Sequence, residues 1–146
     1  MDARESLREF LELLRDLREA VVEDHAVLLV EGERDRASLL GLGLPAASIL
    51  LVHHGVTLSE LVESVVRRGR TVIILTDWDR AGGELAHRIH SLLDDGRVRT
   101  DLTFRRRLAK VVRGETQYVE AVLAWAERAS QRAGAPLDHW LSLPVV

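Results

Sequence analysis

The stretch that decides the fold is Val72-Ile73-Ile74-Leu75-Thr76-Asp77-Trp78-Asp79. It opens with four apolar residues that show no helical period, which predicts a strand buried on both of its faces. Such strands belong to parallel sheets, and ligands gather at their carboxyl ends. Asp77 and Asp79 follow at once and, at a spacing of two, should face the same way. We therefore expect a ligand site where this strand ends.

A second apolar run, residues 26–30, ends in an acid in the same manner, because Glu31 and Gly32 follow it directly. Neighbouring parallel strands end at one edge, so Glu31 should converge with Asp77 and Asp79. Crowded carboxylates raise the pKa of at least one member unless a cation balances them. Hard oxygen ligands suit Mg²⁺ or Mn²⁺. The pattern predicts a metal site.

The rest of the chain alternates between strand and helix patterns. Apolar residues three and four apart predict an amphipathic helix over 3–22, and we expect strands over about 25–30, 49–52, 72–75 and 97–102. Helices should follow the first three strands and stop near Gly43, Gly69 and Gly96, with Thr57 or Ser59 capping the second of them. Two helices separated by Gly114 should close the chain. The order predicts a right-handed, largely parallel α/β sheet with helices on both faces.

Composition limits the function classes. The chain has 146 residues, of which 47% are hydrophobic, and this fits a single domain over 1–146. The absence of cysteine excludes thiolate zinc sites, disulfides and a cysteine nucleophile. The N-terminal stretch is charged and amphipathic, unlike a signal peptide or a membrane span. We expect a cytoplasmic protein without membrane contact.

Positive charge is concentrated in one segment. The whole chain carries −3, whereas residues 97–113 hold seven cations against Asp101 alone. Arg106, Lys110 and Arg113 would share one helix face, which suits contacts to phosphates but is also typical of a solvated surface. We predict a nucleic-acid-binding surface made of these three residues together with Arg34 and Arg105.

Two motifs resemble the Toprim family, the catalytic module shared by bacterial-type primases, type IA topoisomerases, OLD-type nucleases and small ribosomal-RNA maturation nucleases. Residues 30–35, VEGERD, look like its strand-end glutamate motif, and residues 75–82, LTDWDRAG, look like its paired-aspartate motif. Gly55 resembles the loop after the second Toprim strand. The resemblance covers about 25–96, a core flanked by the helix 3–22 and a basic helical extension, 97–146. The nearest likeness is to small stand-alone archaeal Toprim proteins, then to the ribosomal-RNA maturase.

The resemblance implies a Rossmann-like, mostly parallel sheet of about four strands and a Mg²⁺ or Mn²⁺ cofactor. It makes Glu31 the general acid or base, with Asp77 and Asp79 holding the metal and Glu31 close enough to share it. Glu33 stands where the family often has a basic residue. Further site residues implied by the motifs are Gly32, Asp35, Gly55, Arg80 and Gly82.

Phosphodiester chemistry needs charge stabilisation and a proton carrier, which carboxylates with a divalent cation supply. We expect the backbone N–H groups of Gly82 and Gly83 to bind a phosphate, with Arg80 adding a charge-assisted contact. The competing interpretation of Asp77 and Asp79 is helix capping.

Three classes of function remain open. The favoured one is a metal-dependent nuclease acting on structured RNA or DNA. The second is a non-catalytic module that binds nucleic acid or a protein partner, and a related alternative is a catalytic subunit of a primase-like or topoisomerase-like assembly. Topoisomerase activity of this chain alone is disfavoured, because its one tyrosine, Tyr118, falls in a predicted C-terminal helix. The third, a haloacid-dehalogenase-like phosphatase, wants Thr or Val where Ala81 stands.

The histidines and tryptophans leave alternatives. His53 and His54 are either polar surface or contacts to RNA or metal. Trp78 either stacks on an exposed base or packs against the following helix. Trp125 and Trp140 are expected in the core or at an interface.

Overall fold

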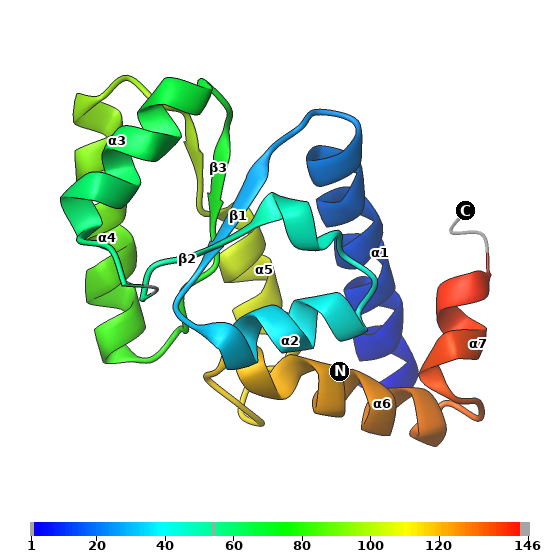
Figure 1. Ribbon diagram of the computed structural model, residues 1–146. Helices are drawn as coiled ribbons and strands as arrows, with labels where there is room; N and C mark the ends of the chain where they lie inside the picture. The colour runs from blue at the N-terminus through cyan, green and yellow to red at the C-terminus, as the bar shows by residue number, and fades with distance from the viewer. Residues whose placement is uncertain (1, 54, 144–146) are drawn as a thin grey trace.

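The computed structural model describes residues 2–53 and 55–143 and contains one four-stranded sheet. All pairings are parallel, and the strand order is β2-β1-β3-β4. The strands are β1 (Val27–Val30), β2 (Ile49–Leu51), β3 (Val72–Ile74) and β4 (Thr100–Asp101). The predicted parallel α/β sheet of about four strands is confirmed (Figure 1).

Helices cover both faces of this sheet. Figure 1 shows α3 and α4 on one side, with α1, α2 and α6 on the other. The described α-helices are α1 (Ala3–Val22), α2 (Glu33–Gly41), α3 (Leu58–Arg68), α4 (Arg80–Asp95), α5 (Thr103–Val111), α6 (Val122–Arg132) and α7 (Leu137–Ser142), and the 3₁₀ turns are η1 (Ala46–Ser48) and η2 (Val119–Ala121).

The strand pattern explains the two layers. Alternate side chains of a strand point to opposite faces, so Val72 and Ile74 join the core under α3 and α4, whereas Ile73 and Leu75 join the core under α1, α5 and α6. These four residues are at most 1% exposed, which is why the sequence shows a continuous apolar run instead of alternation.

On the first face, α3 and α4 present apolar residues at helical spacing. Leu61 and Val65 of α3, and Ile89 and Leu93 of α4, are buried against β1 and β3. Thr57 caps α3: its hydroxyl accepts from the N–H of Glu60, 3.1 Å away, and the Glu60 carboxylate accepts from the Thr57 N–H. The cap is therefore Thr57 and not Ser59, and Gly69, at φ +64°, ends the helix as predicted.

On the second face, α1 and α6 pack together over the sheet. Leu7, Phe10, Leu14 and Leu17 are buried along α1, and the Phe10 ring meets Trp125 edge to face, with 5.2 Å between centroids. Trp125 is thus a core residue. The half-buried Trp140 donates its indole N–H to the carbonyls of Ser130 and Ala135.

The C-terminal part departs from expectation in two ways. The strand predicted over 97–102 is reduced to two paired residues, because Arg97 turns the chain at φ +59° and only Thr100 and Asp101 lie in register with β3. Three α-helices, not two, follow in the described residues. Gly134, at φ +110°, and Pro136, the N-cap of α7, separate the last two, a signal that the sequence contained and our prediction missed.

The topology places the switch point of the sheet between β1 and β3. From β1 the chain passes through α2 to β2 on one flank, and β3 lies on the other flank of β1, so the strand order reverses between these two strands. Ligands of open α/β sheets bind at such switch points, outside the carboxyl ends of the strands. Within residues 2–53 and 55–143, no helix has the length and apolar character needed to cross a membrane.

Candidate metal centre

Glu31 and Asp77 meet at the switch point. The β1–β3 ladder continues past the last strand residue through the Leu75 N–H, which donates to the Leu29 carbonyl at 2.8 Å. The residues just beyond both strands therefore remain side by side, and the Glu31 Oε1 accepts a hydrogen bond from the backbone N–H of Asp77 at 3.3 Å.

Each of the two aspartates accepts a hydrogen bond from a backbone N–H through one of its carboxylate oxygens. Asp77 Oδ1 accepts from the Val119 N–H at 2.8 Å, and Asp79 Oδ1 accepts from the Gly82 N–H at 2.7 Å. Asp79 is the N-cap of α4, so the capping interpretation holds for Asp79. Within the described part of the chain, the second carboxylate oxygen of Glu31, Asp77 and Asp79 makes no hydrogen bond.

Burial and neighbouring negative charges destabilise the charged forms of Glu31 and Asp77. Burial, reinforced by the charges of Asp35, Glu31 and Asp79, raises the pKa of Asp77 to about 6, although the Val119 N–H opposes this. Burial also raises the pKa of Glu31, with the Asp77 N–H opposing and Asp35 and Asp79 adding to the rise. Negative charge is thus concentrated at a partly desolvated edge.

Arg105 lies beneath this acidic loop. Its Nε donates to the Thr76 carbonyl at 3.0 Å and its Nη2 to the Asp77 carbonyl at 2.7 Å. Burial lowers the pKa of Arg105, whereas the charges of Glu31, Asp77 and Asp79 raise it. Sequence reasoning grouped Arg105 with the basic surface, but the structure uses its guanidinium to hold the loop that carries the aspartates.

Gly82 allows α4 to start against the same loop. A Cβ at this position would collide with the carbonyl group of Asp77, and the buried Thr76 hydroxyl donates to the Gly82 carbonyl at 2.7 Å. We expected the Gly82 and Gly83 N–H groups to bind a phosphate, but Asp79 accepts both of them in this structure, through its side chain and its carbonyl respectively.

Two more motif residues, Gly32 and Asp35, form the start of α2, as its N-cap and in its first turn. Asp35 is 7% exposed, and its Oδ2 accepts from the Gly32 N–H at 3.1 Å, which closes the β1–α2 turn. Burial raises the pKa of Asp35, opposed by the Gly32 N–H and reinforced by the charge of Glu120. Asp35 therefore adds negative charge near Glu31 and Asp77 and supports the turn after Glu31.

Other predicted residues lie on the surface. Arg80 is 93% exposed in its side chain and pairs with Glu84 at 3.3 Å. Gly55, at φ +74°, lies in an exposed loop, and Arg34 is exposed on α2. His53 is exposed but close enough for its charge to lower the pKa of Glu31, and His54 lies outside the described residues. Trp78 is half-buried and packs against the core of the second face.

The donor set fits a hard divalent cation. No three acidic or histidine side chains in residues 2–53 and 55–143 are already drawn together as a metal cluster. The site nevertheless offers only oxygen donors, with a free carboxylate oxygen on Glu31, Asp77 and Asp79, and their mutual repulsion would be relieved by a positive ion. These are the residues that would hold the metal.

The comparison with known families is decisive for the class of protein. A model of the Toprim domain matches residues 26–111, which include both acidic loops. The chain belongs to the Toprim family. A Toprim domain implies a metal-dependent function connected with nucleic acid, and Mg²⁺ is the typical cation.

Similar proteins agree with this assignment. The chain is 31% identical to a UPF0292 protein of Methanosarcina acetivorans, over 93% of this chain and 92% of the relative. It is 38% identical to a UPF0292 protein of Thermococcus gammatolerans, over 80% and 82% of the two chains. These relatives confirm the likeness to small archaeal Toprim proteins. A solved structure described as a putative protein from Aquifex aeolicus superposes with a TM-score of 0.64 at 25% identity, over 75% of this chain and 94% of that one.

The Toprim match ends before a segment that closes the site. Residues 116–119 contact the aspartate loop at three points: the Val119 N–H reaches Asp77, the Trp78 N–H donates to the Gln117 carbonyl, and the Trp78 indole donates to the Thr116 carbonyl. Tyr118, predicted in a helix, instead precedes η2 in extended conformation. Nothing local in the sequence indicates these contacts.

Proposed function

We propose that this Toprim protein is a divalent-metal-dependent nuclease that cleaves structured RNA or DNA, with an active site formed by Glu31, Asp77 and Asp79. One observation carries the proposal: three carboxylates at the switch point of the sheet are each anchored by a backbone N–H through one oxygen and keep the other oxygen available. Anchored ligands keep their geometry when a charged substrate arrives.

Each residue has a distinct task. When bound, the cation neutralises charge on the phosphoryl oxygens. Asp77 and Asp79 hold it, while the free oxygen of Glu31 exchanges a proton with the attacking water or the leaving oxygen. The raised pKa of Glu31 brings this carboxyl closer to the range in which an acid can both accept and donate at neutral pH. Arg105 holds the Asp77 loop and offsets part of the negative charge.

The test is cleavage of labelled structured RNA and of supercoiled DNA with Mg²⁺, with Mn²⁺ or with EDTA. Glu31→Gln should reduce the cleavage rate by about 10²–10⁴-fold, the usual worth of a general acid or base. Asp77→Asn should abolish metal-dependent cleavage. The matched control is Glu63→Gln, an exposed acid on α3, which should cleave as the native chain does. Native-like cleavage by Glu31→Gln would rule out its assigned role.

The second candidate is a Toprim module that binds nucleic acid or a protein partner without cleaving. It is favoured by the use of Asp79 as a helix cap and by the separation of the acids in the described residues. Calorimetric titration with Mg²⁺ separates the two. Metal binding without cleavage of either polymer would select the module, and we would then look for partners by co-purification.

A further inference from the structure

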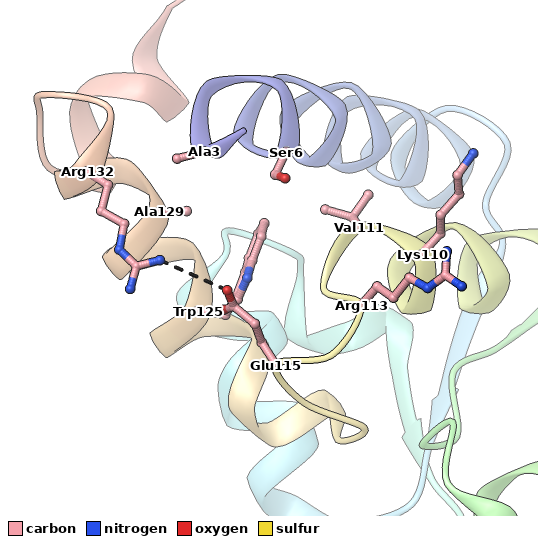
Figure 2. Close-up of a pocket in the computed structure, with 9 residues that line it drawn as sticks. All are labelled: Ala3, Ser6, Lys110, Val111, Arg113, Glu115, Trp125, Ala129 and Arg132. Carbon is pink, nitrogen blue, oxygen red and sulfur yellow. Dashed lines mark ion pairs between the residues drawn. The ribbon is translucent and has the colours of Figure 1, made fainter. Parts of the chain in front are cut away.

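Two hollows lie on the surface formed by α1, α5, α6 and the segment between α5 and α6. The first, of about 500 Å³, is lined by Trp78 and Ala109 together with residues 113–118. The second, of about 380 Å³, lies between α1, α5 and α6 and is shown in Figure 2. Arg113 and Glu115 line both of them, so the two hollows are adjoining parts of one surface track.

The first hollow reaches the aspartate loop at Trp78. Trp78, which lines it, lies between Asp77 and Asp79 in sequence, and its backbone N–H donates to the carbonyl of Gln117, another lining residue. Tyr118 also lines this hollow and is 44% exposed. An exposed aromatic ring one residue before Val119, whose N–H donates to Asp77, is a platform on which an unpaired base can stack.

The second hollow is positively charged. Lys110, Arg113 and Arg132 line it against one acid, Glu115, and the Arg132–Glu115 pair is loose at 4.0 Å. Figure 2 shows Lys110 and Arg113 on one side of the hollow and Arg132 on the other, with Trp125 and Glu115 between them. Among the described residues neither Lys110 nor Arg113 forms an ion pair, so both remain available to a polyanion.

The neighbouring cations of α5 are used within the protein. Arg107 pairs with Asp16 of α1 at 2.9 Å and lies over the Phe104 ring, and Arg105 holds the backbone of the aspartate loop. The cations of α5 therefore have different roles along the helix. Its first turns support the fold and the acidic centre, and its last turn faces the track.

We propose that this track binds a single strand of nucleic acid, with a base stacked on Tyr118 and phosphates at Lys110, Arg113 and Arg132. The inference rests on the proposed function, because it supplies the path by which a strand would reach Glu31, Asp77 and Asp79. A single strand is favoured because stacking needs an exposed base face, which a duplex does not offer. RNA and DNA share the required chemistry of phosphates and stacking bases.

The test measures binding of a labelled 12-nucleotide single strand by fluorescence anisotropy in EDTA, where metal-dependent cleavage cannot occur. The variant Lys110→Gln/Arg113→Gln/Arg132→Gln should bind at least tenfold more weakly at low salt. The slope of log K against log salt should fall by roughly 2, at about 0.7 for each single-strand phosphate contact. The control Arg67→Gln/Arg68→Gln/Arg70→Gln removes the same charge from exposed positions around the end of α3 and should bind as the native chain does. Equal binding by the two triple variants would overturn the track.

Tyr118 gives an independent readout. Tyr118→Ala should weaken binding by about tenfold, within the 1–3 kcal/mol that stacking contributes, whereas Tyr118→Phe keeps the ring and should bind normally. Equal weakening by both variants, or tighter binding of a 12-base-pair duplex than of the single strand, would overturn the proposal. Parallel titrations with RNA and DNA of one sequence identify the preferred polymer.

The same set of proteins separates this proposal from the nuclease assignment. If Glu31→Gln and the native chain both fail to cleave while the track variants lose binding, the track stands without the nuclease. If the native chain cleaves and the track variants bind and cleave normally, the nuclease stands without the track.

Discussion

The two faces of the sheet contribute differently to the acidic centre. The α3–α4 face packs apolar side chains at helical spacing, and its one contribution to the centre among the described contacts is the start of α4, which Asp79 caps. The face covered by α1, α5 and α6 also sends Arg105 and the Val119 N–H to the aspartate loop. The comparison teaches that one layer supplies mainly stability, and the other supplies stability together with the support of the site.

The largest expected effect is on the α3–α4 face. Ile89 has no exposed surface, so Ile89→Ala should lower the free energy of unfolding by about 2–5 kcal/mol. Metal affinity of the folded protein should stay unchanged, because Ile89 belongs to the core cluster under α3 and α4, which contains no residue of the acidic loops. Urea denaturation and Mg²⁺ calorimetry check the two parts. Loss of metal affinity in folded Ile89→Ala would contradict the conclusion that the α3–α4 face contributes mainly stability.

A smaller loss of stability, but a clear loss of function, is expected at Arg105. Arg105→Gln removes two hydrogen bonds to backbone carbonyls and should cost about 1–3 kcal/mol of unfolding free energy. Cleavage should fall at least tenfold because the aspartate loop loses its support. The control on the same helix is Arg107→Gln, whose exposed pair with Asp16 is worth about 0–1 kcal/mol and should leave cleavage unchanged. Equal behaviour of the two variants would contradict the role of Arg105.

The electrostatic cost of the site predicts a pH dependence. The pKa of Asp77 is about 6 in the fold, above its ordinary value of 3.8, so the folded state binds more protons and the charged carboxylate lowers stability. The destabilisation of the fold by the Asp77 charge reaches its full size above about pH 6 and is absent below about pH 4. In EDTA, Asp77→Asn should therefore melt a few degrees higher than the native chain at pH 7.5, where about 1 kcal/mol corresponds to roughly 2–4 °C. The difference should vanish at pH 4. An equal difference at both pH values would show that the charge of Asp77 is not its cause.

The smallest effect distinguishes a cation of α5 from one just beyond its end. Arg106, on α5, and Arg113 are both exposed and were predicted to share one helix face, but α5 ends at Val111 and only Arg113, just beyond it, lines the track. Arg113→Gln should lower the salt slope of single-strand binding by about 0.7, and Arg106→Gln should lower it less. Equal slopes would favour a diffuse basic surface over a track.

Much of the fold could be predicted because its signals are local. The apolar run before Asp77 marks a strand buried on both faces, and Thr57 with Glu60 marks a helix start within four residues. The predicted pair of C-terminal helices was wrong because Gly134 and Pro136 were not read as a break. The strand over 97–102 was too long because pairing depends on the neighbouring strand, and β3 provides partners for only two of its residues.

By itself, the sequence determined which carboxylates stand at the ends of buried strands, and so where the acidic centre would form. Only the tertiary structure decided what holds those carboxylates. Arg105 lies 28 residues from Asp77 along the chain, and Val119 lies 42 residues away. Neither contact has a local pattern, because a backbone N–H exists at nearly every residue and an arginine on a helix surface looks alike whether it faces solvent or a carbonyl. Packing of α5 and η2 against the sheet makes that choice.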